Sequence, residues 1–116
     1  MTKPNIHFMR LQNRYFQYIK TGSKRIELRL YDEKRKQIQL NDVIEFENEN
    51  KEKINTKVIA LLHYHNFNDL LADFDINILA DQSITKNDLL SDLNRFYSPE
   101  QQKQFGVLGI RLELMD

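Results

Sequence analysis

The sequence predicts one α+β domain in which several strands precede a helical segment and a final strand follows it. Alternating apolar and polar residues, which are typical of strands, occur in residues 26–31 and 107–114. Helical spacing of apolar residues occurs in residues 12–21 and 66–105. The chain has 116 residues, of which 41% are hydrophobic, and it contains no evident linker or internal repeat. We therefore expect residues 1–116 to share one core as a single domain.

The composition indicates which kinds of site and which cellular compartment to expect. The chain has no Cys, which excludes disulfides and thiolate metal sites and favours a reducing compartment. It has no apolar run as long as a signal peptide or a spanning helix requires, so we expect a soluble, cytoplasmic protein without a membrane partner. The 17 basic and 17 acidic side chains cancel, yet residues 1–36 carry ten basic and three acidic ones. Such asymmetry is typical of a positive region that meets an anionic partner, unless the two halves neutralise each other in the fold.

The first half of the chain predicts one helix among strands. Tyr15, Phe16 and Ile19 recur at helical spacing, and Gly22 follows them as a residue that commonly ends helices. The strand candidate at 54–64 is apolar on both faces at its centre, which is typical of a strand covered on both sides. In order, we expect a strand at 5–9 with Ile6 and Phe8 on one face, the helix at 12–21 and a strand at 26–31. These are followed by a charged turn or a single helical turn at 32–36, a turn at Asn41-Asp42, a strand at 43–46, a polar hairpin tip at 47–53 and the strand at 54–64.

Three capped helices and a strand are expected in the second half. Asn66 and Thr85 suit the first positions of two helices, because each is followed three residues later by an Asp. Ser98 followed by Pro99 predicts a third helix, which should end at Gly106. In the last strand the expected inward residues are Leu108, Ile110, Leu112 and Leu114, and the expected outward residues are Gly109, Arg111 and Glu113. A terminal strand of this kind often closes a sheet or barrel that began near the N-terminus.

Residues 22–29, Gly-Ser-Lys-Arg-Ile-Glu-Leu-Arg, concentrate charge between the first helix and the turn at 32–36. Alternation puts Glu27, Arg29 and Tyr31 on one strand face and Lys24 at the loop edge, as a mobile positive charge. An Arg fork suits phosphate or carboxylate, and a Glu beside it accepts hydrogen bonds, orients a cation or acts as a general base. The alternative is an ordinary salt-bridge ladder on an exposed strand, worth about 0–1 kcal/mol.

The spacing Gly-x-Lys-x-x-Glu-x-Arg at these positions resembles the signature of the ASCH domain family, which belongs to the PUA-like group of small barrels. The order of predicted elements resembles that family over most of the chain. The stretches RLYDEKR at 29–35 and YSPE at 97–100, leading to FGVLGI at 105–110, resemble its small stand-alone bacterial form. Asn41 departs from the Gly-Asp turn common in the family, but Asn tolerates positive φ, so we expect the turn to be kept. The resemblance implies a mainly antiparallel β-barrel with a helical insert between its last two strands.

The resemblance also implies a function related to RNA or nucleotides. We expect RNA or a nucleotide-like ligand to bind in a cleft between the strand that carries the motif and the helical insert. Lys24 and Arg29 would contact phosphate or an acceptor group, and Glu27 would accept from a base edge or hold Arg29. The residues expected at the site are Gly22, Lys24, Glu27, Arg29, Tyr31, Lys34 and Arg35.

A small hydrolase is the alternative that the resemblance implies. Some small bacterial relatives remove the acetyl group of acetylcytidine with a catalytic Lys at the place of Lys24, a Thr nucleophile at the place of Glu27 and a Glu from the insert. A Glu cannot replace a hydroxyl nucleophile, and the nearest insert carboxylate is Asp81. A version in which Glu27 activates water and Lys24 polarises the carbonyl stays open, as does a ribonuclease that uses Lys24 and Tyr31. Whether the protein is an enzyme is left open.

The remaining candidates carry less weight. His63-x-His65 places two imidazoles on one strand face, but His7 is the only other His, and a metal site wants a third and usually a fourth ligand. We therefore expect no metal and no other cofactor. Lys34-Arg35-Lys36 is either a solvated turn or an extension of a positive rim for a phosphate backbone. The sequence gives no indication of the oligomeric state, and no exposed apolar stripe supports a protein-interaction role.

Overall fold

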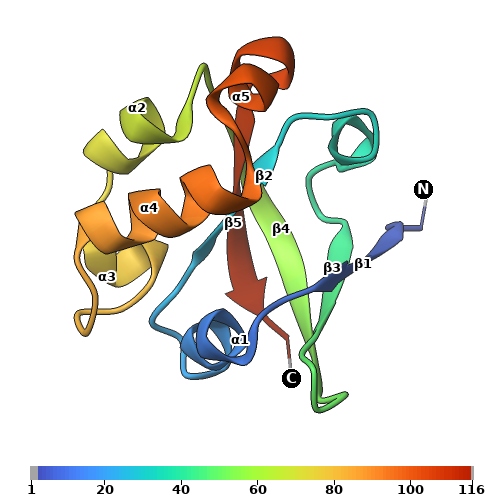
Figure 1. The fold of residues 1–116 in the computed structure, drawn as a ribbon. Helices are drawn as coiled ribbons and strands as arrows, with labels where there is room; N and C mark the ends of the chain where they lie inside the picture. Colours follow the sequence, from blue (N-terminus) through green and yellow to red (C-terminus); the bar gives the residue numbers. More distant parts are fainter. Residues whose placement is uncertain (1–2, 116) are drawn as a thin grey trace.

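The computed structural model describes residues 3–115 as a curved five-stranded sheet, with helices α2 to α5 along one side and helix α1 at one end (Figure 1). The elements follow the predicted order, with one additional helix, α3. They are β1 (Ile6–Arg10), α1 (Asn13–Lys20), β2 (Ile26–Leu30), the 3₁₀ helix η1 (Arg35–Gln37), β3 (Val43–Glu47), β4 (Lys53–Tyr64), α2 (Phe67–Ala72), α3 (Ile76–Leu79), α4 (Lys86–Phe96), α5 (Pro99–Phe105) and β5 (Val107–Leu114).

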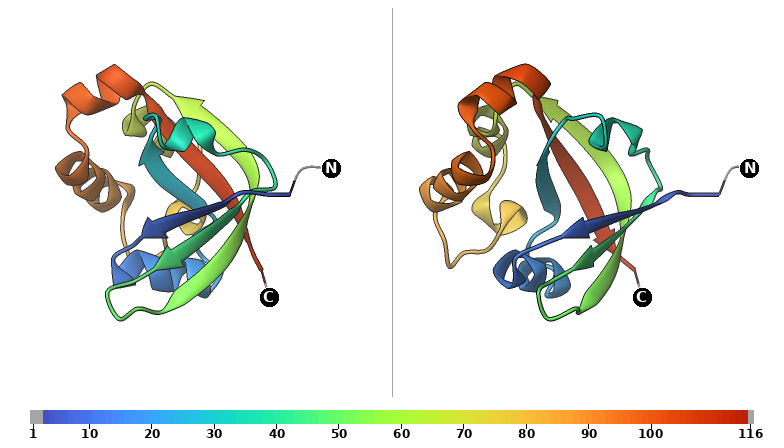
Figure 2. Two further views of the ribbon diagram at one scale, coloured as in Figure 1. Left: turned by 90° about the vertical axis from the view of Figure 1, so that its right-hand side faces the viewer. Right: turned by 45° about the vertical axis from the view of Figure 1, so that its right-hand side comes forward.

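The sheet has the strand order β1-β3-β4-β5-β2, and only the pair of β1 and β3 is parallel. It curls into a half-barrel whose two edge strands are β1 and β2 (Figure 2). The predicted class is therefore confirmed: an α+β, mainly antiparallel, barrel-like sheet with a helical insert between β4 and β5. The last strand, β5, lies between β4 and β2, so it joins β2 to the rest of the sheet and leaves β2 as one edge.

Two clusters of buried side chains form the core. One fills the inside of the half-barrel, where Phe16 and Ile19 of α1 pack against Ile44 and Phe46 of β3. The other lies between the sheet and the helical insert, and it includes Ile26, Leu28 and Leu30 of β2. All residues of β2 except the half-buried Arg29 are buried, so both faces of the strand are covered, and Glu27 is only 3% exposed. The alternative interpretation, a salt-bridge ladder on an exposed strand, is therefore wrong, because the charged face that the alternation predicted is buried.

Strand β5 is also covered on both faces over its first half. Gly109, which we expected to face outward, is buried, and a side-chain carbon at this position would lie 3.2 Å from Leu70 and 3.3 Å from Ile26. The missing side chain lets helix α2 approach the sheet, since any larger residue would hold Leu70 away. At the other end of the strand Leu114, expected inward, is 42% exposed because no element covers it.

The predicted helix ends are confirmed by their caps. The side chains of Asn66, Thr85 and Ser98 each accept a hydrogen bond from a backbone N–H three residues later, and the last two form capping boxes. Gly106 ends α5 at φ 73°, and Asn41 keeps its turn at φ 74°. Helix α3, a single turn begun by Asp75, was not predicted because four residues leave little periodicity to detect.

Strand β4 is less covered than its apolar centre suggested. A register shift between Val58 and Ala60 marks a bulge, and Ile59, which lies at this bulge, is 42% exposed.

Within residues 3–115, none of the helices combines the length and the apolar character needed to cross a membrane.

Substituting Gly109 by Ala should lower the free energy of unfolding by about 1–3 kcal/mol, because the added carbon is forced against Leu70 and Ile26. Urea unfolding followed by circular dichroism measures the change. The control is Glu113→Ala on the exposed end of the same strand, which should stay within about 0.5 kcal/mol of the parent protein. Equal stability of both variants would contradict the close approach of α2.

Candidate functional site

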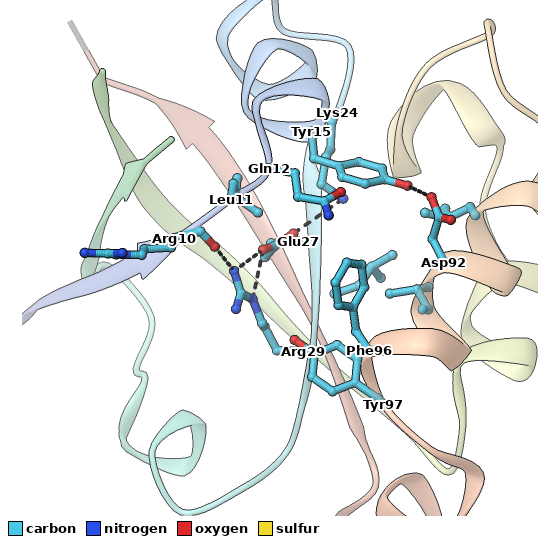
Figure 3. Close-up of a pocket in the computed structure, with 13 residues that line it drawn as sticks. Arg10, Leu11, Gln12, Tyr15, Lys24, Glu27, Arg29, Asp92, Phe96 and Tyr97 are labelled. Carbon is cyan, nitrogen blue, oxygen red and sulfur yellow. Dashed lines mark hydrogen bonds and ion pairs between the residues drawn. The ribbon is translucent and has the colours of Figure 1, made fainter. Parts of the chain in front are cut away.

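A pocket of about 140 Å³ lies where β2, α4 and the junction between β1 and α1 meet (Figure 3). Its position follows from the topology, since the half-barrel is open between its edge strands and the insert covers part of this opening. Its lining combines three aromatic side chains and four leucines with five charged side chains. The residues used below are Tyr15, Lys24, Glu27, Arg29, Asp92, Phe96 and Tyr97.

Three charged side chains of the motif form a buried ion cluster, here defined as Lys24, Glu27 and Arg29. The Arg29 Nε donates to Glu27 Oε2 at 2.9 Å, and Lys24 Nζ lies 3.5 Å from Glu27 Oε1. Arg29 Nη2 also donates to the backbone carbonyl of Arg10 at 2.9 Å. The side chains of Lys24, Glu27 and Arg29 are 2%, 5% and 12% exposed. The cluster therefore links the two edge strands of the half-barrel, whose backbones do not pair.

Lys24 is fixed rather than mobile, which corrects the expectation from its place at the loop edge. Its Nζ donates to the carbonyls of Ile26 at 2.7 Å and Leu79 at 2.8 Å, besides its contact with Glu27. An ammonium has three donors, so these partners account for all of them. Burial lowers the pKa of Lys24, while the Glu27 carboxylate partly opposes that shift. The side chain thus joins β2 to the end of α3.

The charges around Glu27 decide its protonation. Burial alone would raise the pKa of this carboxyl, but the nearby charges of Arg29 and Lys24 and a hydrogen bond from Arg29 outweigh burial. The pKa of Glu27 is therefore lowered, and the carboxylate is ionised at neutral pH. The same two effects oppose each other at Arg29. Burial lowers its pKa, but the charge of Glu27 raises it, and the net result is a raised pKa. The cluster is an ionic assembly of two cations around one anion.

A second polar contact crosses the pocket between α1 and α4. The Tyr15 hydroxyl donates to Asp92 Oδ2 at 2.6 Å, and Arg95 Nη2 donates to Asp92 Oδ1, also at 2.6 Å. Burial, followed by the hydrogen bond to Asp92, raises the pKa of Tyr15, so the phenol stays protonated. The hydrogen bond from Tyr15 is the main cause of a lowered pKa at Asp92. In Figure 3 the Tyr15 ring extends from α1 toward Asp92.

The structure brings together some of the predicted site residues and separates others. Lys24, Glu27 and Arg29 line the pocket, whereas Gly22, Tyr31, Lys34 and Arg35 do not. Gly22 follows the end of α1 at φ 88°, and Lys34 precedes η1. Arg35 pairs with Asp32 at 3.0 Å. The Tyr31 ring packs edge-on against His63 with ring centres 4.6 Å apart.

Sequence reasoning missed the contribution of α4. Asp81, the insert carboxylate considered for a catalytic role, accepts a hydrogen bond from the Ser83 N–H and lies outside the pocket. The insert carboxylate that lines the pocket is Asp92. In the sequence, Phe96 only continues the apolar spacing of Leu89 and Leu93, which predicts a buried residue. The structure shows that Phe96 is instead 56% exposed at the pocket. Nothing local distinguishes Asp92, whose role depends on Tyr15, 77 positions away.

The histidines do not converge. His7 Nε2 lies 2.8 Å from Asp42 Oδ2, at the start of the pair of β1 and β3. Between residues 3 and 115, His, Asp and Glu side chains form no group of three or more suited to hold a metal ion.

Replacing Lys24 by Met should lower the free energy of unfolding by about 3–5 kcal/mol, because two buried carbonyls and a buried carboxylate each lose a donor. The matched control is Lys20→Met in the exposed pair of Lys20 and Glu52, which should cost less than about 1 kcal/mol. Urea unfolding measures both. A Lys24 variant no less stable than the Lys20 variant would refute the structural role of this lysine.

Glu27 should also make stability depend on pH. Its pKa lies below the ordinary 4.5 in the folded chain, so the unfolded chain binds more protons between the two values. The stabilisation is therefore complete above the ordinary pKa and is lost as pH falls through the lowered one. Unfolding curves from neutral pH to about pH 3 should show a shallower acid loss in Glu27→Gln than in the parent protein. Parallel curves would show that Glu27 does not contribute.

The comparisons with known proteins agree with this architecture. The hypothetical protein PH0355, whose crystal structure is known, is 33% identical, with a TM-score of 0.83 over 95% of this chain and 99% of that chain. Protein PF0455 from Pyrococcus furiosus, solved by NMR, is 34% identical, with a TM-score of 0.76 over 96% of this chain and 98% of that chain. No curated protein matches the sequence. The bacterial origin suggested by the motif stays a prediction, since one of these relatives comes from Pyrococcus furiosus.

A family model fits nearly the whole chain. The ASCH domain model matches residues 9–116, which include the motif, the helical insert and β5. The match agrees with the resemblance drawn from Gly22, Lys24, Glu27 and Arg29 and with the half-barrel that carries them. The chain therefore belongs to the ASCH domain family.

Proposed function

We propose that the protein binds a nucleotide-like ligand, either a free nucleotide or one base of an RNA strand, in the pocket beside the ion cluster. One observation carries the proposal: the pocket has the size of a single ring, and aromatic and charged side chains line it together. Its volume of about 140 Å³ is close to the 150 Å³ of a cavity known to hold benzene in another protein. Membership of the ASCH family supports a role related to RNA.

Aromatic side chains supply the stacking surface that such a ligand needs. Phe96 lines the pocket and is 56% exposed, although it lies on a helix whose neighbouring apolar residues are buried. Tyr97 and Tyr15 contribute further aromatic wall. An exposed ring at the opening of a pocket costs solvation unless something packs on it, and a base has two flat faces to offer. Stacking of this kind contributes about 1–3 kcal/mol per base.

The charged side chains of the pocket would read the edge of the ring. Glu27 is ionised and accepts hydrogen bonds, while Arg29 presents several N–H donors in a fixed plane. Holding both in one orientation removes most of the side-chain entropy that binding would otherwise cost. We propose that these two groups pair with the polar edge of a base and that Asp92 contacts the ligand nearer the opening.

We propose that residues other than Lys24 and Arg29 contact the phosphate group. The donors of Lys24 are used within the fold and Arg29 is only 12% exposed, so a solvated phosphate would not reach either without losing its water. Arg14 and Arg95 are exposed, and the positive charge of each helps to lower the pKa of Asp92, which lines the pocket. We propose that these two arginines contact the phosphate group, with the base directed inward.

Replacing Phe96 by Ala should weaken binding of nucleoside monophosphates and short single-stranded RNA by about 5- to 150-fold, the equivalent of 1–3 kcal/mol of stacking. Calorimetric titration with each of the four monophosphates measures the effect. Leu40→Ala is the matched control, because Leu40 is 57% exposed and lies outside the pocket, so its affinity should match the parent protein.

The salt dependence of the same titration tests the phosphate contacts. Two phosphate-binding arginines predict a shallow fall of affinity with salt, and Arg95→Gln should reduce the slope by about one contact. Absence of binding to every nucleotide and RNA tested, or equal affinity in the Phe96 and Leu40 variants, would remove the support for this function.

A hydrolase acting on a modified nucleoside or on RNA is the second candidate. The observation that favours it is the lowered pKa of buried Lys24 beside an ionised carboxylate, an arrangement common at catalytic sites. In this version Glu27 activates a water molecule, and Lys24 gives up one of its backbone carbonyl partners in order to polarise the bond under attack. Incubation with acetylated cytidine and with short RNA, followed by chromatography, separates the two candidates. Binding without product excludes the enzyme, whereas product that disappears in Glu27→Gln supports it.

A further inference from the structure

Among the strands of residues 3–115, β1 pairs only with β3, so its other edge has no partner strand there. It pairs with β3 in parallel, and a parallel ladder engages the N–H and C=O of alternate residues on one side. The N–H of Val43 bonds to the carbonyl of Asn5, so the odd-numbered residues of β1 face β3. The N–H and C=O groups of Ile6, Phe8 and Arg10 therefore point to the other side. Of these, the carbonyl of Arg10 accepts from Arg29.

The side chains on this edge are apolar and exposed. Ile6 is 58% exposed and Phe8 is 63% exposed, whereas Met9, which points into the half-barrel, is 5% exposed. Natural sheets commonly protect such edges with charged residues, bulges or covering elements. Residues 5–9 contain no Lys, Arg, Asp or Glu.

We propose that two copies of this chain associate through their β1 edges, as antiparallel strands around a two-fold axis at His7. In this register Ile6 lies opposite Phe8 of the second copy, and each such pair exchanges two backbone hydrogen bonds. The two equivalent pairs place four apolar side chains together on the outer face of the joined sheet. Cross-strand pairs of aromatic and β-branched residues are among the stabilising ones.

The ends of the strand favour this register over its neighbours. Pro4 lies opposite Arg10 of the second copy, where a Pro offers no N–H. The Arg29 guanidinium already donates to the Arg10 carbonyl on this side, so backbone pairing between the copies ends at Phe8 and the Arg10 carbonyl needs no donor from Pro4. Moving the axis to Ile6 would instead set Pro4 against Phe8, whose carbonyl would lose its partner. Moving the axis to Phe8 would set the Arg10 side chain against Ile6.

A second copy suits this edge for two further reasons. The chain carries no net charge, so two copies do not repel one another as whole molecules. An antiparallel strand pair between identical edges is its own complement, which a closed symmetric dimer requires. One strand and two apolar side chains from each copy bury less than the roughly 1,600 Å² of a standard interface, so the dimer should be weak.

Sedimentation equilibrium over about 1–500 μM protein tests the proposal, because a small interface dissociates within that range. The parent chain should change from monomer to dimer as concentration rises. Phe8→Lys should raise the dissociation constant at least about tenfold, since it puts a charge on the pairing edge. The matched control is Ile59→Lys, which adds the same charge at a residue that is 42% exposed on β4, away from the edge. Circular dichroism verifies that both variants fold.

The register is tested by crosslinking, which the absence of Cys makes unambiguous. At the proposed axis the two copies of residue 7 form a non-hydrogen-bonded pair about 4.5 Å apart between Cα atoms, within the range of a disulfide. Oxidised His7→Cys should therefore form a covalent dimer, whereas Asn5→Cys should not. A monomer at every concentration, or equal dimerisation of the Phe8 and Ile59 variants, overturns the association. Crosslinking through residue 5 rather than residue 7 overturns the register.

Discussion

The buried ion cluster of Lys24, Glu27 and Arg29 is the interaction on which the rest of this structure depends. Removing three charged groups from water costs several kcal/mol per ion, and attraction between the ions repays that cost only when every donor and acceptor has a partner. The partners come from three places: β2 itself, the carbonyl of Arg10 on β1, and the carbonyl of Leu79 on α3. The cluster is therefore satisfied only when both edge strands and the insert are in place together.

This arrangement explains where the pocket lies. A closed barrel would bury the edges of β1 and β2 against each other, whereas the half-barrel leaves them joined by one arginine side chain. The opening between them is lined by charged groups on one side and by the apolar face of α4 on the other. Tyr15 and Asp92 bridge this opening from α1 to α4. The same residues that complete the fold thus leave a small cavity with fixed polar groups, which suits selective binding of a flat ligand.

The sequence predicted the elements well and the surroundings of the motif only in part. Caps at Asn66, Thr85 and Ser98 depend on local contacts, so local patterns were sufficient to find those helices. The two-sided burial of β2 and the inward place of Gly109 depend on which elements pack above and below, and no local pattern records that. Lys24 followed the parity of the apolar face, yet its charge led to the expectation of a mobile side chain. Asp92 belongs to the pocket through a contact with Tyr15 that joins distant parts of the chain.

The outer contacts of the ion cluster have an evolutionary consequence. Lys24 and Arg29 reach across to Leu79 and Arg10 through backbone carbonyl groups, and every amino acid supplies a carbonyl. A mutation that changes the side chain at position 10 or 79 therefore leaves these acceptors present, so no compensating change at position 24 or 29 is required. Covariation between the motif and its spatial neighbours should accordingly be weak, and a short contiguous signature is all that such a site would leave in a sequence.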